Sequence, residues 1–230
     1  MTNISNNIVV VEQKIALARK QAHREDKVQL LAVSKTKPIS AIKQAFSHGL
    51  SHFGENYVQE SVEKIQQIKA DPYFDRPIYW YFIGPLQSNK TRPVAEHFDW
   101  VQSVDRLKIA QRLNEQRPSD MPQLNICLQV NISGEQSKSG TTLDEVMELA
   151  AQVQDLPRLK LRGIMAIPEN SDDPKIVEEQ FLALFKIYNT LQQKYSEIDT
   201  LSMGMSGDLA SAIKCGSTMV RIGTDIFGAR

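Results

Sequence analysis

Apolar residues along the chain follow two alternating patterns. Short continuous apolar runs are typical of strands buried in a sheet, and they occupy residues 28–35, 51–55, 78–84, 99–104, 125–133, 161–167, 199–205 and 218–223. Between these runs, apolar residues recur every three or four positions, which predicts amphipathic helices. The helical spacing covers residues 39–46, 58–65, 143–149 and 181–188, and a leading segment whose apolar residues are Ile4, Ile8, Val11, Ile15 and Ala18.

Strands that alternate with helices in this way predict an α/β protein built as a single (β/α)8 TIM-type barrel with an extra N-terminal helix. The chain has 230 residues, close to the about 250 that are typical of this fold. We expect one domain over residues 1–230, with the leading helix in 1–24 and the barrel in 25–230. The alternative is an open doubly wound sheet, which would need fewer strands or a free edge.

The charge balance of the chain argues against a polyanionic partner. Lysine and arginine together number 27, as do aspartate and glutamate, so no basic excess marks a nucleic-acid or anionic-membrane surface. The N-terminal segment has no basic leader, and no apolar run has the length of a membrane span. The two cysteines, Cys127 and Cys215, fit a reducing compartment. We therefore expect a cytoplasmic protein with a small-molecule partner.

Several common chemistries have no support in the sequence. The four histidines, His23, His48, His52 and His97, lack ligand spacing, and cysteine and histidine do not cluster, so we expect no metal site. The glycines do not form a P-loop or a dinucleotide fingerprint. A G-x-S-x-G elbow does not occur either, so a hydrolase triad is not expected.

A lysine stands at the end of the first predicted strand, in the stretch "QLLAVSKTKP" at residues 29–38. In (β/α)8 barrels the C-terminal ends of the strands carry the chemistry, so Lys35 would face a shared, partly dry pocket. One interpretation is an amine whose pKa is lowered and which forms a Schiff base with a carbonyl. The other is a strand-end lysine that reaches solvent. Lys37 competes for the first role, but Pro38 holds it extended in the following loop, so we favour Lys35.

The last two predicted strands end in segments suited to an anion. Ser206 precedes a short helix and would be its N-cap, with unsatisfied backbone N–H groups behind it. Gly223 would let the backbone approach an anion closely, and Thr224 adds a hydroxyl. A phosphate site in the loops after strands seven and eight is a recurrent feature of these barrels. An ordinary helix cap is the alternative for Ser206, and the charge of Asp208 must point away from any phosphate.

Arg221 lies in the middle of the apolar run "TMVRIGT". Because a guanidinium keeps its charge, an inward-facing arginine needs an acceptor. One interpretation is an ion pair with a barrel carboxylate, for which Glu55 is a candidate. The other is a cation that keeps the nitrogen of an aromatic ring unprotonated. Asn56, in "FGENY", either reaches a phenolic oxygen on such a ring or caps the helix that follows.

Ordered blocks over nearly the whole chain resemble one family. In chain order they are "LLAVSKTKP", "FGENYVQE", "FIGPLQSNK", "HFDWVQSVDR", "QVNISGEQSKSG", "LRGIMAIPE", "LSMGMSGDL" and "GSTMVRIGTDIFGAR". They closely resemble the YggS/PROSC family of small proteins, which bind pyridoxal 5'-phosphate (PLP) and take part in vitamin B6 homeostasis. The resemblance implies a fold similar to the N-terminal barrel of alanine racemase, with PLP held as an internal aldimine.

The resemblance also implies roles for individual residues. The family's Schiff-base lysine, in "AVSK", corresponds to Lys35, and the arginine that faces the pyridine nitrogen corresponds to Arg221. The other cofactor-binding residues that it implies are Ser206, Gly223 and Thr224 at the phosphate, and Asn56 and Met165 near the ring.

Three further positions need comment beside the family pattern. The family often has histidine before "FIGPLQ", where this chain has Tyr81, so a role for a ring at this position is not carried over. The usual "RIGTAIFG" reads "RIGTDIFG" here, and we expect the added charge of Asp225 to weaken phosphate binding slightly. Lys138, in "EQSKSG", matches a family lysine at the mouth of the site, to which we assign no firm role.

Two functional hypotheses follow. The first is a carrier that holds PLP reversibly on Lys35 and passes it to apo-enzymes or withholds it, without dedicated catalysis. Electron-sink catalysis by PLP works best with a protonated pyridine nitrogen, which an adjacent Arg221 cation opposes. The second is an amino-acid racemase-like PLP enzyme, which needs a second acid–base group, such as Tyr57 or Tyr81. We favour the carrier, as a monomer or weak dimer, with PLP-dependent apo-enzymes as candidate partners.

Overall fold

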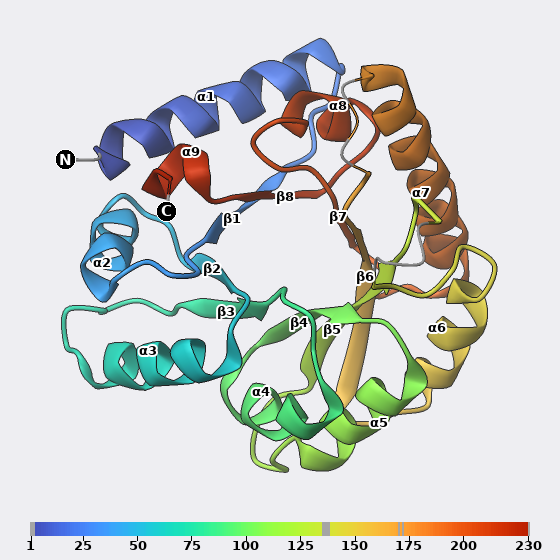
Figure 1. The fold of residues 1–230 in the computed structure, drawn as a ribbon, viewed down its shortest axis with the longest axis horizontal. Helices are drawn as coiled ribbons and strands as arrows, with labels where there is room; N and C mark the ends of the chain where they lie inside the picture. The colour runs from blue at the N-terminus through green and yellow to red at the C-terminus, as the bar shows by residue number, and fades with distance from the viewer. Residues whose placement is uncertain (1–2, 135–138, 170, 172, 230) are drawn as a thin grey trace.

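The structure, a computed structural model, describes residues 3–134, 139–169, 171 and 173–229. Its centre is a closed barrel of parallel strands in which each strand pairs with the next and β8 pairs back onto β1 (Figure 1). The strands are β1 Gln29–Val33, β2 His52–Glu55, β3 Tyr79–Phe82, β4 Trp100–Val104, β5 Leu124–Val130, β6 Leu159–Ala166, β7 Thr200–Ser202 and β8 Met219–Ile222. The expected (β/α)8 barrel is confirmed, and the open doubly wound sheet is wrong because the closed barrel has no free edge.

Helices form a ring around the strands (Figure 1). They are α1 Ile4–Gln21, α2 Ile39–Ser47, α3 Val58–Ala70, the 3-10 turn η1 Ser88–Lys90, α4 Thr91–His97, α5 Leu107–Gln116, α6 Val146–Gln154, α7 Pro174–Lys194, α8 Leu209–Lys214 and α9 Thr224–Phe227. The apolar spacing located α2, α3, α6 and α7, whereas α4 and α5 lie in segments where it marked no helix. The short α4 buries only Thr91, Val94 and Ala95, whereas α5 buries Ile109, Ala110 and Leu113, which the sequence reading did not pick out.

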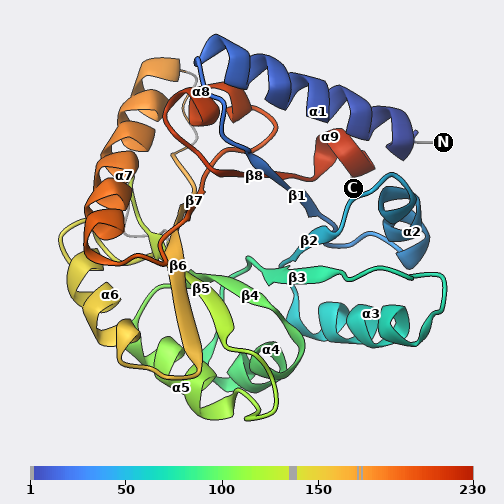
Figure 2. The ribbon, with the colours of Figure 1, turned by 180° about the vertical axis from the view of Figure 1, so that it is seen from behind.

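The leading helix α1 lies against the last part of the barrel. It packs on α8, α9 and α2, and the two ends of the chain lie near one another on that side (Figures 1 and 2). All of the apolar residues predicted for its inner face are buried, namely Ile4, Ile8, Val11, Ile15 and Ala18. Burying a valine or isoleucine side chain contributes about 1.5–3 kcal/mol. Burial of this face therefore explains why α1 packs on the barrel although it lies outside the repeating strand–helix units.

The interior of the barrel is closed by an apolar layer distinct from the core under the helices. Its members are Leu31, Tyr81, Trp100, Cys127, Met165 and Met219. Tyr81 stacks on Trp100 with ring centroids 5.1 Å apart, and its hydroxyl lies 3.0 Å from His52 Nδ1. Inward-facing residues of TIM barrels stack in such layers, so this one forms a packed floor and not a channel.

The structure also bears on membrane-spanning helices, metal-ligand clusters and the two cysteines. Within the described ranges, no helix is long and apolar enough to cross a membrane. The same part of the chain holds no group of three or more histidine, cysteine or acidic residues that could bind a metal ion. Cys127 and Cys215 are buried thiols without a disulfide.

Candidate functional site

Lys35 follows the end of β1 in a tight turn. The backbone N–H of Lys37 donates to Ser34 O at 3.0 Å, and Thr36 has a positive φ of 62°, a conformation that is uncommon for a residue with a side chain. Lys35 itself is half-buried and lines a cavity of about 290 Å³. The turn therefore directs the strand-end lysine toward the mouth of the barrel.

A buried polar network supports this turn from below. The Lys64 ammonium lies 2.7 Å from Glu55 Oε1 and 3.0 Å from Glu60 Oε1, and it donates to Ser34 O at 3.1 Å. The Ser34 hydroxyl donates to Glu55 Oε1 at 2.6 Å, and the Thr36 N–H donates to Glu60 Oε1 at 2.7 Å. Burial raises the pKa of the Glu55 carboxyl, and the Lys64 ammonium opposes that rise. Glu55 is thus the partner of Lys64, and its proposed ion pair with Arg221 is wrong.

Lys37 is engaged elsewhere. Its ammonium donates to three backbone carbonyls at the end of the chain, those of Phe227 at 3.2 Å and of Gly228 and Ala229 at 2.9 Å. Lys37 is half-buried, and its three bonds hold the segment after α9 against the loop that follows β1. Lys37 does not line the Lys35 cavity.

The Lys35 cavity collects residues from the C-terminal ends of six strands. Lys35 follows β1, Asn56 follows β2, and Arg221 lies near the end of β8. Its full lining is Val33, Lys35, Asn56, Ile83, Ile167, Met205, Ser206, Gly207, Arg221, Gly223 and Thr224. Six of the seven residues expected to bind cofactor are therefore brought together, at the end of the barrel where such folds carry their sites.

Ser206 lies in the cavity wall but does not cap the following helix. Helix α8 begins at Leu209, and Asp208 occupies its N-cap position. Asp208 Oδ1 accepts a hydrogen bond from the Met205 N–H at 2.5 Å, which closes a turn over residues 205–208. The predicted N-cap is wrong because this turn places two more residues between Ser206 and the helix. Burial raises the pKa of the Asp208 carboxyl.

Gly223 and Thr224 line the same cavity as Ser206. Gly223 occupies the N-cap position of α9, and Thr224 is the first residue of that helix. A Cβ atom on Gly223 would lie 3.3 Å from Val33 O, so a side chain here would press on the end of β1. The glycine thus lets β8 and β1 approach one another beside the cavity.

Arg221 is buried at the wall of the cavity and held by uncharged oxygens. One terminal nitrogen donates to Ser202 O at 2.7 Å and to Ser202 Oγ at 2.8 Å. The other terminal nitrogen donates to Ala166 O at 2.9 Å. No described carboxylate lies within ion-pair distance of this guanidinium. Burial lowers the pKa of Arg221 to about 10, so it remains a cation at neutral pH.

Asn56 has an unsatisfied oxygen in this wall. Its Oδ1 is buried and has no hydrogen-bond partner, and the N-cap position of α3 is Tyr57, without a side-chain cap bond. The alternative that Asn56 caps that helix is therefore wrong. A Cβ atom on Gly84 would lie 2.2 Å from Asn56 O, so the glycine in "FIGPLQ" is required for the close approach that fixes Asn56. Sequence reasoning did not identify Gly84 in this role.

Met165 is the one expected residue that does not line the cavity. It is fully buried in the apolar layer inside the barrel, whereas Ile167, two positions further along, lies in the cavity wall and is 41% exposed. Side chains two apart on a strand point to the same face, so Ile167 points to the same side as Met165. Because β6 ends at Ala166, Ile167 lies beyond the strand, in the cavity wall. The lining residues Val33, Ile83, Met205 and Gly207 were also not anticipated, because apolar and small residues have no chemical signature in sequence.

Asp225 carries the charge that departs from the family pattern, and it is paired. Its carboxylate lies 2.9 Å from the Lys14 ammonium of α1, and this contact lowers the pKa of Asp225. The charge is thus partly neutralised from outside the barrel. Lys138 lies outside the described residues.

Comparison with known proteins shows which family this chain belongs to. A family model described as "Alanine racemase, N-terminal domain" matches residues 9–230. Two proteins named "Pyridoxal phosphate homeostasis protein" are each 55% identical to this chain: that of Vibrio alginolyticus, with 100% of this chain and 99% of the relative covered, and that of Haemophilus influenzae, with 99% and 96% covered. The chain belongs to the pyridoxal phosphate homeostasis protein family.

A solved structure agrees with that assignment. PipY of Synechococcus elongatus, determined with PLP bound, is 31% identical and superposes with a TM-score of 0.85, covering 98% of this chain and 100% of PipY. The resemblance drawn from the sequence blocks is therefore confirmed at the level of the pyridoxal phosphate homeostasis protein family and of its alanine racemase-like barrel. The relatives are named for homeostasis and not for a catalysed reaction.

Proposed function

We propose that this protein binds PLP in the Lys35 cavity, as an internal aldimine on Lys35, and takes part in cytoplasmic PLP homeostasis without dedicated catalysis. The observation that carries the proposal is the meeting of an amine, an amide, a cation and two hydroxyls around one cavity: Lys35, Asn56, Arg221, Ser206 and Thr224. Lys35, Asn56 and Arg221 each match a different part of PLP, and Ser206 and Thr224 both match its phosphate. The PLP-bound relative PipY and the names of the other relatives support the choice of ligand.

The residues fit the cofactor without rearrangement of the strands. Gly223 and Thr224 offer a backbone N–H and a hydroxyl for the phosphate. The Ser206 hydroxyl, which is hydrogen-bonded to Asp225, would turn from that carboxylate to the phosphate. At Gly207 an added Cβ would meet no atom within 4 Å, so there is open space beside Ser206. The Asn56 amide lies in the same wall, where its NH2 group can donate to the phenolic oxygen. Met165 would act only as part of the layer beneath the cavity.

The carrier role is favoured over a racemase by the polar groups of the cavity. PLP supplies an electron sink when its pyridine nitrogen is protonated. The buried Arg221 cation, which lines the cavity, would oppose protonation of that nitrogen. Racemisation further requires a second acid–base group, and neither candidate tyrosine lines the cavity, because Tyr81 lies in the interior layer and Tyr57 is 47% exposed.

The test is borohydride reduction of the PLP-loaded protein, followed by peptide mass spectrometry. We expect a pyridoxyl adduct on Lys35. It should be lost in Lys35→Ala and retained in Lys37→Ala, which is the matched control two residues along the chain. An adduct on another lysine, or none at saturating PLP, would refute the assignment. The racemase alternative predicts deuterium exchange at the α-carbon of an amino acid in the presence of loaded protein. The carrier predicts no exchange with any member of a broad amino-acid panel.

A further inference from the structure

The turn that carries Lys35 contains a strained residue. Thr36 has a φ of 62°, and a β-branched side chain rarely occupies this left-handed region. In the part of the chain that the structure describes, His23 is the one other non-glycine residue with a positive φ, and histidine tolerates this region better. Backbone strain persists only where the surroundings impose it, and it is concentrated at functional sites. The contacts of Thr36 therefore identify what imposes its conformation.

Glu60, in the first turn of α3, accepts the hydrogen bond that holds Thr36. The Thr36 N–H donates to Glu60 Oε1 at 2.7 Å, and the same oxygen lies 3.0 Å from the Lys64 ammonium. Hydrogen bonds to an ionised acceptor are shorter and stronger than those between neutral groups. Glu60 thus ties the residue after Lys35 to the start of α3.

The residue before Lys35 is held by a different set of bonds. The Lys64 ammonium donates to Ser34 O at 3.1 Å, and the Ser34 hydroxyl donates to the buried Glu55 carboxylate at 2.6 Å. Removal of the Glu60 carboxylate would leave both of these bonds in place, because neither involves Glu60. The Glu60 contact can therefore be removed separately from the buried pair that supports the fold.

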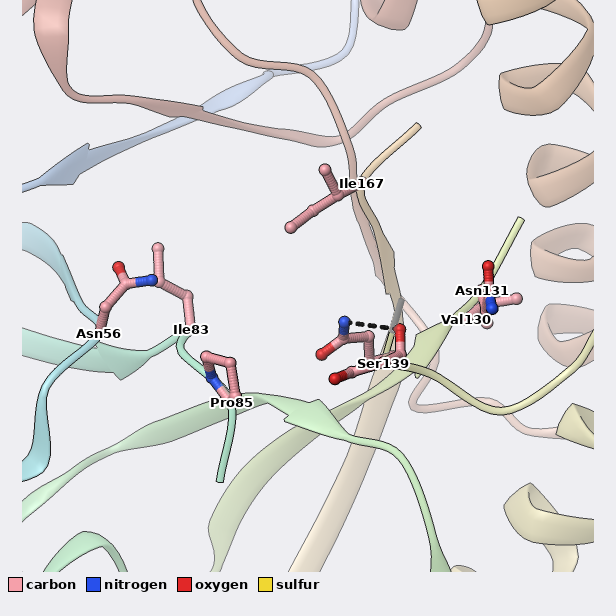
Figure 3. Close-up of a pocket in the computed structure, with 8 residues that line it drawn as sticks. Asn56, Ile83, Pro85, Val130, Asn131, Ser139 and Ile167 are labelled. Carbon is pink, nitrogen blue, oxygen red and sulfur yellow. Dashed lines mark hydrogen bonds between the residues drawn. The ribbon is translucent and has the colours of Figure 1, made fainter. Parts of the chain in front are cut away.

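Thr36 and Glu60 lie outside the space that a ligand would occupy. Neither lines the Lys35 cavity. Nor do they line the adjoining cavity of about 270 Å³, in which Figure 3 shows Asn56 and Asn131 on opposite sides. The two residues instead line an open groove behind the turn, where 35% of the Glu60 side chain is exposed. A change at either position therefore removes no group that would contact a bound ligand.

We infer that Glu60 is a positioning residue for the condensation of the Lys35 amine with the aldehyde of the cofactor. By holding Thr36 in the left-handed conformation, Glu60 fixes the direction in which the Lys35 side chain leaves the turn. In the condensation the amine nitrogen forms a double bond to the aldehyde carbon, and the aldehyde oxygen leaves as water. A fixed amine reacts as if it were highly concentrated, so release of the turn weakens this step and not the binding of the phosphate. The inference rests on the proposed function.

The experiment compares PLP with pyridoxine 5'-phosphate, which carries an alcohol in place of the aldehyde and cannot condense with Lys35. Fluorescence titration measures the affinity of each compound for the parent, Glu60→Ala and Glu63→Ala. Glu63 is the matched control, because it is an exposed carboxylate on the same helix and contacts Gln59. We expect Glu60→Ala to weaken PLP binding at least about tenfold, or about 1.4 kcal/mol, and pyridoxine 5'-phosphate binding less than about twofold. Glu63→Ala should leave both affinities unchanged.

A second substitution tests whether the conformation of the turn transmits the effect. Asparagine adopts the left-handed region more readily than threonine. Thr36→Asn in the Glu60→Ala background should therefore bind PLP at least about threefold more tightly than Glu60→Ala alone. Amide hydrogen exchange in the unloaded protein, followed by NMR, gives a readout without ligand. The Thr36 N–H should exchange at least about tenfold faster in Glu60→Ala than in the parent.

An equal loss of affinity for the two compounds in Glu60→Ala would overturn the inference, because it would indicate a general distortion of the cavity. Unchanged PLP affinity in that variant, the same loss in Glu63→Ala, or no recovery in the double variant would overturn it as well. A Glu60→Ala variant that does not fold would show that Glu60 supports the fold instead. Failure of the proposed function has a separate signature, which is a missing Lys35 adduct in the reduced parent protein, and the inference would then fall with it.

Discussion

Two buried cations near the mouth of the barrel, Lys64 and Arg221, are held in different ways. They are almost equally hidden, with exposed fractions of 5% and 4%. The Lys64 ammonium contacts two carboxylates, Glu55 at 2.7 Å and Glu60 at 3.0 Å. Its charge is therefore neutralised within the chain, and it does not line the Lys35 cavity.

Arg221 has the opposite arrangement. Its hydrogen bonds go to Ser202 and Ala166, which supply uncharged oxygens, and the Asp208 carboxylate acts on the guanidinium without a direct ion pair. The same guanidinium lines the cavity beside Lys35. A charge paired directly with carboxylates serves the fold, whereas a charge at a cavity wall without a direct ion pair is available to a ligand. At the same end of the barrel, Lys64 thus stabilises the fold and Arg221 is available to a ligand.

The largest expected effect comes from breaking the compensated pair. Lys64→Met leaves the Glu55 carboxylate buried without a cation, and removal of one partner from a buried pair costs about 3–5 kcal/mol of stability. Urea unfolding, followed by circular dichroism, measures the change. The double variant Glu55→Gln with Lys64→Met should recover most of the loss, because it removes both charges. A single variant as stable as the parent would contradict the structural role of Lys64.

A smaller loss of stability but a larger effect on the ligand is expected at Arg221. Arg221→Gln deprives the Ser202 and Ala166 carbonyls of a charged donor, for which we expect about 1–3 kcal/mol. Without the cation, the pyridine nitrogen of bound PLP should gain a proton near neutral pH. The ¹⁵N NMR shift of labelled PLP reports this directly. Arg221→Lys, which retains a cation, should keep the parent shift, and identical shifts in all three proteins would show that Arg221 does not control this nitrogen.

Most of the fold was predictable because its signals are local. Eight apolar runs and a helical period lie in the sequence itself, and the buried face of α1 was predicted residue by residue. The candidate site was predicted where its residues carry chemistry at strand ends, as Lys35 and Arg221 do. Strand ends meet in a closed barrel, so membership of one cavity followed from the fold.

The remaining features depend on where each element ends and on how neighbouring elements pack. The pairing of Glu55 with Lys64 joins β2 to α3 across the barrel wall, and Glu55 could equally have satisfied Arg221 on sequence grounds. Ile167 replaces Met165 in the cavity wall because the end of β6 falls between them. The N-cap of α8 moved from Ser206 to Asp208 through a turn that has no unique sequence pattern.

The uncharged pair of Tyr81 and His52 should give an intermediate loss of stability on substitution. Tyr81→Phe removes the hydroxyl that lies 3.0 Å from His52 Nδ1, and the loss of one such bond costs about 1 kcal/mol. Because Tyr81 does not line the Lys35 cavity, we expect unchanged PLP affinity, measured by fluorescence titration. Tyr79→Phe serves as a control, since Tyr79 is 43% exposed. A fall in PLP affinity in Tyr81→Phe alone would extend the functional site into the barrel interior.

The smallest effect is expected for the exposed pair of Lys14 and Asp225, whose side chains are 52% and 27% exposed. Surface pairs contribute about 0–1 kcal/mol, so Asp225→Asn should lower the free energy of unfolding by less than about 1 kcal/mol at pH 7. The pKa of Asp225 is lowered in the folded protein, so the contribution is present above the unfolded value of 3.8 and is lost as the pH falls through the folded value. Thermal unfolding should therefore separate the variant from the parent at pH 7 and bring the two together in strong acid. A difference that persists in acid would mean that Asp225 acts through packing of α1 on α9 and not through its charge. Of the two pairs compared, only the buried one, Lys64 with Glu55 and Glu60, would then stabilise the protein by charge compensation.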